Sequence, residues 1–162
     1  MKPDEPKDPM RVGWREWLCL PQLAIPAIKA KIDTGARTSA IHAFQIRPFT
    51  DGGVPWVSFV LRPRQRLRNP SIECTAPIVD ERKIRSSSGD QERRFVIEAE
   101  ACLGEYSWPI ELSLTNRDEL GFRMLIGREA IRRNFLVNPD RSYLIGRSFA
   151  DIVTTPNRKK PK

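Results

Sequence analysis

Apolar residues recur at every second position through much of the chain, in short runs bounded by turn residues. The clearest run is segment 106–114, and segment 94–103 shows the same alternation. Gly104-Glu105 lies between them, so the two segments predict a hairpin with one buried face. The side chains expected on that face are Phe95, Ile97, Ala99, Ala101, Trp108, Ile110, Leu112 and Leu114.

Most of the remaining chain also has strand patterns, with β-branched and aromatic residues between Gly, Pro, Asn and Asp. Only segment 128–134 is typical of a helix, with Ala130 and Ile131 on its inner side. The fold class expected from this order is a mainly β domain, most naturally a closed barrel, with one short C-terminal helix. Further strands are predicted at 11–20, 27–33, 39–46, 54–61, 71–84, 122–126, 135–137 and 143–145.

The length of 162 residues fits one domain, which we place at 11–150. Segment 1–10 has Pro and alternating charge with nothing to bury, and predicts a disordered tail. Segment 151–162 is expected to be a basic C-terminal tail. No apolar run is long enough for a membrane span or a signal peptide, so a cytoplasmic protein without a membrane partner is expected.

Few residue types are present that could hold a metal or attack a substrate. The three cysteines are far apart, and His42 is the single histidine. Neither a phosphate-binding loop nor a His-Glu-x-x-His motif occurs. We therefore expect free thiols, no metal site and no cofactor.

The net charge of +8 agrees with a soluble surface or with an acidic partner. Much of the positive charge lies in loop 62–68 and in the C-terminal tail. Basic loops and tails are more often solvated than specific, so nucleic-acid binding is the minority interpretation.

An acid ends the strand predicted at 27–33, in the sequence Asp33-Thr34-Gly35-Ala36. Gly35 lets the backbone turn freely, and Ala36 leaves room for an approaching group. The Thr34 hydroxyl can bond the backbone and fix the turn. Taken alone, the segment is most simply a tight turn between two strands.

Two segments together resemble a known family. Ile32-Asp-Thr-Gly-Ala36 resembles the active-site loop of retropepsins, and Leu125-Ile-Gly-Arg128 before a short helix resembles their late segment. The wider wording of residues 29–40, with Arg94-Phe-Val-Ile-Glu98, resembles a bacterial retropepsin-like group associated with ATP-grasp glutamate ligases. Its members are often labelled "ATP-dependent zinc protease". The resemblance covers roughly residues 12 to 147.

The resemblance implies a retropepsin-like closed β-barrel and an aspartic endopeptidase. Catalysis would use Asp33, Thr34 and Gly35, with a water activated between two carboxylates that share one proton. Because the chain has one such motif, the resemblance implies an active homodimer with Asp33 from each subunit at the two-fold axis. Hairpin 86–90 would close over the substrate. The substrate-binding residues implied are Ala36, Arg37, Ser87, Ser88, Gly89, Ile126, Gly127 and Arg128.

Arg37 departs from the viral pattern, in which an Asp at this position pairs with the late Arg. Here Arg37 is expected to face Arg128, so either Arg128 has another acidic partner or the site is cationic. A cationic site, with Arg93 or Arg94 nearby, would select acidic peptide. That choice suits a family linked to ligases that add glutamate, and a functional link to an ATP-grasp ligase follows from the same resemblance. A solvated surface arginine is the equally weighted alternative for Arg37.

Two other functions are compatible with the same sequence. The first is a monomeric peptide-binding barrel of the same fold, in which Asp33 is a structural acid. The second is a basic β domain that binds RNA, which the charge alone favours less. Substitution of Asp33 and the oligomeric state separate the first from a peptidase, and salt dependence of RNA affinity tests the second.

Overall fold

The structure is a computed structural model, and it describes residues 8–64, 70–85, 89–116 and 121–145. The predicted tails fall largely outside these ranges. Within them, no helix is long and apolar enough to cross a membrane. The elements are β1 Met10–Gly13, β2 Arg15–Leu20, η1 Pro21–Leu23, β3 Ile25–Asp33, β4 Ser39–Asp51, β5 Val54–Leu61, β6 Ile72–Pro77, β7 Asp80–Arg85, β8 Gln91–Leu103, β9 Tyr106–Thr115, β10 Met124–Gly127, α1 Arg128–Ile131 and β11 Phe135–Asn138.

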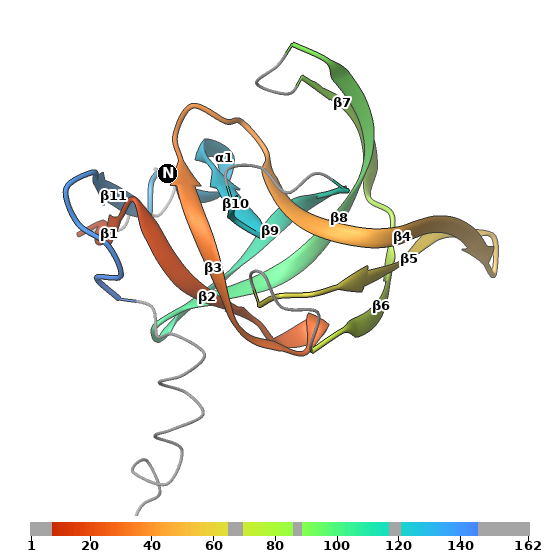
Figure 1. Cartoon of the computed structure of the whole chain (residues 1–162), viewed down its shortest axis with the longest axis horizontal. Coiled ribbons are helices and arrows are strands. Elements are labelled where there is room, and N and C mark those ends of the chain that lie inside the picture. The colour runs from red at the N-terminus through yellow and green to blue at the C-terminus, as the bar shows by residue number, and fades with distance from the viewer. Residues whose placement is uncertain (1–7, 65–69, 86–88, 117–120, 146–162) are drawn as a thin grey trace, which may run out of the picture.

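The strand pairings close on themselves. Around this ring the order is β3, β2, β8, β9, β4 and β10, and β10 pairs with β3 again. β10 is parallel to β3 and antiparallel to β4, so it lies between them (Figure 1). β5 and β6 extend the sheet beyond β4, and β7 pairs with β8 in an arm that projects from the ring. The expected mainly β fold with one short late helix is confirmed.

The core lies inside this ring and is built by the alternation seen in the sequence. β8 and β9 pair so that Ile97 lies opposite Leu112 and Ala99 opposite Ile110. All four side chains are buried. Each large apolar side chain removed from water in this way stabilises the fold by about 1.5–3 kcal/mol. The hairpin predicted from segments 94–103 and 106–114 is therefore confirmed.

One inward position of β2 carries a charge instead of an apolar group. Glu16 is 0% exposed, next to Leu18 and Leu20 on the same face of the strand. Its Oε2 atom accepts the backbone N–H groups of Gly13 and Leu144, both at 2.8 Å. Its Oε1 atom accepts the N–H of Ile145 at 3.2 Å. A buried carboxylate is tolerated when N–H donors replace its water, so Glu16 ties the end of the described chain to β2.

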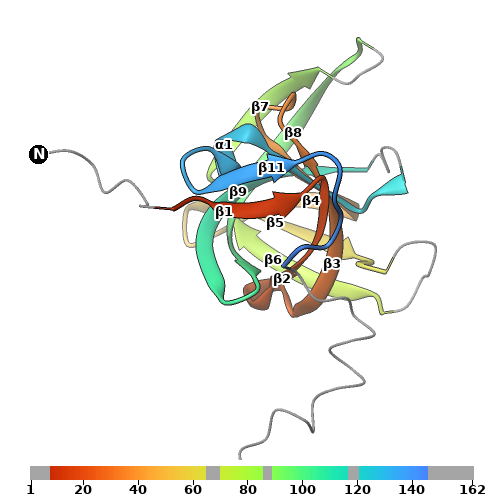
Figure 2. The ribbon, with the colours of Figure 1, turned by 90° about the vertical axis from the view of Figure 1, so that its left-hand side faces the viewer.

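These bonds explain why the strand predicted at 143–145 is wrong. Tyr143 has a φ of 55° and donates its N–H to the Arg15 carbonyl, and the next two N–H groups go to Glu16. β11 instead pairs in parallel with β1, as Figure 2 shows.

Other expectations differ in extent. The strand predicted at 11–20 divides at Trp14 into β1 and β2, and the one predicted at 39–46 continues to Asp51. The helix predicted at 128–134 ends at Ile131, and Arg133 has a φ of 78°, which lies outside helical geometry. The long extended segment 71–84 divides into β6 and β7, which pair with different strands, β5 and β8.

Candidate active site

Two parallel strands place Asp33. It is the last residue of β3, half-buried, and lies beside Gly127, the last residue of β10. One position earlier, Ile32 and Ile126 are paired and buried, at 7% and 1% exposure. The acid thus leaves the core at a point fixed on both sides by apolar packing.

A tight turn then holds the carboxylate. The Gly35 N–H donates to Asp33 Oδ1 at 3.0 Å, and the Ala36 N–H donates to the Asp33 carbonyl at 3.2 Å. This Asx-type turn uses one carboxylate oxygen as an acceptor. A Cβ atom on Gly35 would approach Asp33 Oδ1 to 3.3 Å, so a larger residue here would crowd the acid.

Gly127 packs directly against the far side of the loop. A Cβ atom on it would lie 2.8 Å from the Arg37 carbonyl oxygen and 2.9 Å from that of Ala36. Only glycine allows this approach. The Gly127 N–H donates to Ser39 Oγ at 3.0 Å, which joins the end of β10 to the start of β4.

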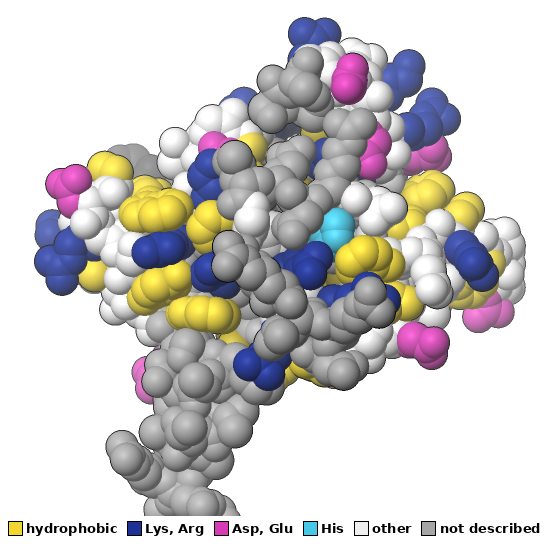
Figure 3. Space-filling view, viewed as in Figure 1, with side chains coloured by type: hydrophobic (Ala, Val, Ile, Leu, Met, Phe, Trp, Pro, Cys, Tyr) yellow, Lys and Arg dark blue, Asp and Glu magenta, His cyan; other side chains and the backbone are white. Residues whose placement is uncertain are grey.

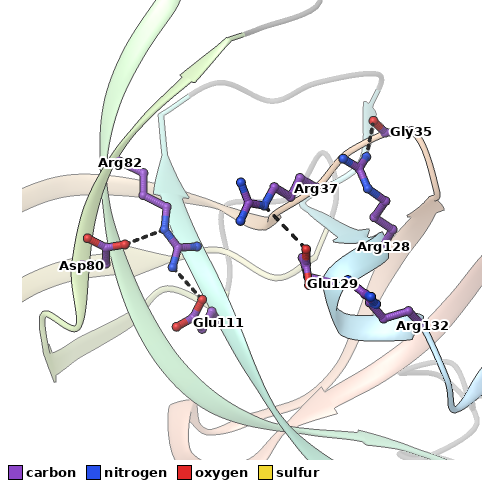
Figure 4. Close-up of polar contacts among 8 residues, drawn as sticks. All are labelled: Gly35, Arg37, Asp80, Arg82, Glu111, Arg128, Glu129 and Arg132. Carbon is purple, nitrogen blue, oxygen red and sulfur yellow. Dashed lines mark hydrogen bonds and ion pairs between the residues drawn. The ribbon is translucent and has the colours of Figure 1, made fainter.

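The first turn of α1 is bonded to the same loop. The Arg128 N–H donates to the Ala36 carbonyl at 2.7 Å, and the Glu129 N–H donates to the Arg37 carbonyl at 3.2 Å. The Arg128 guanidinium adds a bond from Nη1 to the Gly35 carbonyl at 3.1 Å (Figure 4). Arg128 therefore supports the acid loop through backbone oxygens.

Arg37 and Arg128, which the sequence is expected to place face to face, contact different partners. Arg37 Nε lies 3.5 Å from Glu129 Oε1, while Arg128 bonds the Gly35 carbonyl (Figure 4). The Arg37 and Glu129 side chains are 76% and 47% exposed, so this ion pair contributes little stability. Arg37 thus remains at the surface with an acidic neighbour.

A cavity of about 320 Å³ opens beside Asp33, between the acid loop, the arm residues Ile84, Arg85 and Arg94, and the start of β10. Its basic lining residues are His42, Arg85, Arg94 and Arg123, and Asp33 is the one acid among its described lining residues. In the view of Figure 3, Lys and Arg side chains lie across the middle of the molecule. The remaining lining residues are Gly35, Ala36, Thr38, Ala40, Ile84, Thr115, Phe122, Met124 and Leu125.

Of the two arginines considered at the hairpin, Arg94 belongs to this cavity. Arg94 is 5% exposed and its Nε lies 3.1 Å from Glu92 Oε2, which also accepts the Thr115 hydroxyl at 3.3 Å. Arg93 is 68% exposed and pairs with Glu81 at 3.3 Å, away from the cavity lining. Arg94 is therefore held rigidly at the cavity wall.

A second cavity of about 590 Å³ lies on the other side of Thr38, beside α1 and β9. It is lined in part by Arg37, Glu129 and Arg82. Arg82 bonds Glu111 at 2.8 Å and Asp80 at 2.6 Å (Figure 4), and its hydrogen bond to Asp80 lowers the pKa of that carboxyl. This triad ties the base of β7 to β9.

The structure brings most of the predicted site residues together, on one loop and its support. Asp33, Gly35 and Ala36 line the first cavity, and Thr34 is exposed beside them. Ile126 and Gly127 are buried behind the loop. Gly89, exposed with a φ of 91°, lies at the edge of the arm, while Ser87 and Ser88 lie outside the described residues. Their catalytic and binding roles stay predictions.

The cavity also contains residues to which the sequence assigned no role in a site. Arg85 ends β7, Arg123 precedes β10, and His42 lies within β4. These residues are far apart in the sequence and form no local motif. The pairing of β10 with β4 brings Arg123 and His42 close together. In the part of the chain that the structure describes, no three His, Cys, Asp or Glu residues are grouped as metal ligands would be.

Comparison with known proteins gives three findings. Residues 11–148 match the family model of the RimB-like retropepsin-like aspartic endopeptidases. Probable alpha-L-glutamate ligases of Shewanella pealeana and Parasynechococcus marenigrum are 50% and 49% identical over 135 residues. That match covers 83% of this chain but only 30% and 29% of those relatives.

A crystal structure of a Legionella pneumophila protein of unknown function has a similar fold. It superposes with a TM-score of 0.71 at 25% identity, and the match covers 85% of this chain and 98% of the Legionella chain. The fold is therefore found in an experimental structure of similar length.

Proposed function

The chain belongs to the RimB-like family of retropepsin-like aspartic endopeptidases, and from this premise we propose that it hydrolyses peptide bonds with a water held between two Asp33 carboxylates. The single observation that carries the proposal is the setting of Asp33. It is fixed by the Gly35 N–H and by the pairing with Gly127, at the mouth of a cavity.

Two copies of the chain are needed for this chemistry. An aspartic peptidase uses one carboxylate as a base and a second, protonated one as an acid, and two adjacent carboxylates retain one proton because both cannot ionise readily. Asp33 is the one acid in the described lining of its cavity. A homodimer supplies the second acid as Asp33 of the other copy.

The proposed reaction then proceeds by proton transfers between these acids and the substrate. The ionised carboxylate takes a proton from the water, whose oxygen attacks the carbonyl carbon of the scissile bond. The protonated carboxyl donates a hydrogen bond to the carbonyl oxygen, which gains negative charge. The C–N bond breaks as the amine receives a proton, leaving a carboxylic acid and an amine.

The substrate that best fits the cavity is an acidic peptide. Arg85, Arg94, Arg123 and His42 line the space beside Asp33. Guanidinium groups bind carboxylates with paired hydrogen bonds, so glutamate side chains near the scissile bond would be favoured. This proposal moves the acid-selecting role from Arg37 to the cavity wall.

The relatives named as glutamate ligases support the same substrate. In them a region about 50% identical to this chain makes up about 30% of a longer protein. A peptidase region joined to a ligase suits a cycle in which glutamate is added and removed. We therefore propose that this chain acts on peptides or proteins that carry added glutamate, in functional association with an ATP-grasp ligase.

Paired peptides test both levels of this proposal. One peptide carries a glutamate tail and the other the same tail in glutamine, which keeps the shape and removes the charge. We expect hydrolysis of the first, strongly reduced hydrolysis of the second, and none of either by Asp33→Asn. Equal rates on both peptides would overturn the acidic substrate alone, while cleavage that survives Asp33→Asn would overturn the mechanism.

A further inference from the structure

Two of the three cysteines lie opposite each other on neighbouring strands. The antiparallel pairing of β2 and β8 places Cys19 opposite Cys102, and a hydrogen bond joins their thiols. Both side chains are half-buried. The third cysteine, Cys74, is also half-buried, and its Sγ lies 4.0 Å and 3.8 Å from the carbonyl oxygens of Leu23 and Ile72.

This arrangement suits a disulfide without movement of the backbone. Residues directly opposite in antiparallel strands have Cα atoms about 4.5–5.5 Å apart. Disulfides span Cα distances of about 4.4–6.8 Å. We propose that Cys19 and Cys102 form a redox-active dithiol site, which peroxide oxidants convert reversibly into a disulfide across the β2–β8 seam.

The two sulfurs have different surroundings, which sets the order of reaction. Burial, reinforced by the hydrogen bond to Cys102, raises the pKa of Cys19 to about 12, so this thiol stays protonated at neutral pH. Cys102 Sγ lies 3.2 Å from the hydroxyl of Ser107, an exposed residue of the β8–β9 hairpin. Because Cys19 stays protonated, we expect an oxidant to react with Cys102 first.

The chemistry balances with peroxide as the one co-reactant. The Cys102 thiolate attacks a peroxide oxygen, the O–O bond breaks, and a sulfenic acid and hydroxide form. The Cys19 sulfur then attacks the Cys102 sulfur, and its proton leaves with the displaced hydroxyl as water. Two thiols and one hydrogen peroxide thus give one disulfide and two waters, and an external thiol reverses the bond.

The bond would join strands that have little other direct pairing. Cys19 and Cys102 are the one residue pair in register between β2 and β8, although this seam belongs to the closed ring. The cross-link encloses about 80 residues, so it restricts the unfolded chain strongly, and the melting temperature should rise by about 5–10 °C. Cys19 lies at the end of β2 that is far from Asp33. We therefore expect the disulfide to change stability more than activity.

Mass spectrometry of the full chain after treatment with hydrogen peroxide tests the proposal. We expect a loss of about 2 Da, a linked peptide containing Cys19 and Cys102, and reversal by dithiothreitol. Cys74→Ser should behave identically. Cys19→Ser should gain oxygen at Cys102 instead, whereas Cys102→Ser should stay largely unmodified, because burial raises the pKa of both remaining thiols. Oxygen addition to the wild-type thiols without the 2 Da loss, or a link through Cys74, would overturn the site.

A second measurement tests the proximity of the two thiols in the reduced protein, with Cys19 and Cys102 both intact. Phenylarsine oxide bridges two neighbouring thiols, so the reduced wild-type chain and Cys74→Ser should each bind one equivalent. Absence of binding by both folded proteins would contradict the dithiol arrangement.

Discussion

The Arg128 guanidinium donates a hydrogen bond of 3.1 Å to the Gly35 carbonyl, and this bond connects α1 to the turn that holds Asp33. The Arg128 N–H bonds the next carbonyl of the loop, that of Ala36, at 2.7 Å. Backbone and side chain of one residue therefore fix two successive peptide units of the proposed catalytic loop.

Arg128→Ala should loosen this loop without unfolding the domain. The loss of one exposed hydrogen bond costs about 1 kcal/mol of unfolding free energy. Misplacement of Asp33 should lower kcat by about tenfold or more. Denaturant unfolding and peptide hydrolysis measure the two effects. Arg132→Ala is the matched control, because Arg132 lies just beyond α1 and pairs with Glu129. The activity of this variant should stay near that of the wild type.

Gly127→Ala should be among the most destabilising single-methyl additions to this chain. The new Cβ atom would lie 2.8–2.9 Å from backbone atoms of Ala36, Arg37 and Thr38, which cannot move as a flexible side chain would. We expect a loss of at least about 3 kcal/mol, seen as a lower thermal midpoint. Gly35→Ala meets only Asp33 Oδ1, at 3.3 Å, and should reduce activity more than stability. A reversed order would contradict this packing.

Glu16→Gln should destabilise the domain although the side chain keeps its shape. Both Glu16 oxygens accept backbone N–H groups, and an amide nitrogen cannot accept any. At least one buried N–H then loses its acceptor, at a cost of about 2 kcal/mol. Hydrogen exchange at Gly13, Leu144 and Ile145 should rise. Glu98→Gln, on the exposed side of β8, is the control and should change neither quantity.

The sequence predicted the parts of the site that are local or motif-like. Asp33-Thr34-Gly35 marked the end of a strand, and the alternation in segments 94–114 indicated a hairpin. The partners of Arg37 and Arg128 could not be predicted from the sequence. They depend on the direction of the Glu129 side chain, which a helix of one turn does not determine.

The failures elsewhere have the same origin in contacts between distant residues. Residues 143–145 have strand composition, but Glu16 takes the N–H groups of Leu144 and Ile145. No pattern around Glu16 marks it as buried, and only the described fold shows that it lies inward among N–H donors. The cationic cavity likewise needs the pairings of three separate strands.

Arg85→Gln should reduce selection for acidic peptide. Arg85 lines the cavity beside Asp33, so kcat/KM for the glutamate-tailed peptide should fall about tenfold, the worth of one charged hydrogen bond, while the glutamine-tailed peptide is unaffected. Arg93→Gln removes the same charge from outside the cavity and pairs with Glu81 in the wild type. Equal effects of the two substitutions on the glutamate peptide would indicate a general charge effect instead.

The pairing of two Asp33 residues is tested most directly by mixing subunits. Wild-type protein and Asp33→Asn are combined in equal amounts, at constant total concentration, and allowed to exchange. Hydrolysis of the glutamate-tailed peptide is then compared with that of wild type alone. If each site needs Asp33 from both copies, about a quarter of the activity remains, because about a quarter of random dimers carry two intact acids. Retention of about half would contradict the account, since each chain would then act alone.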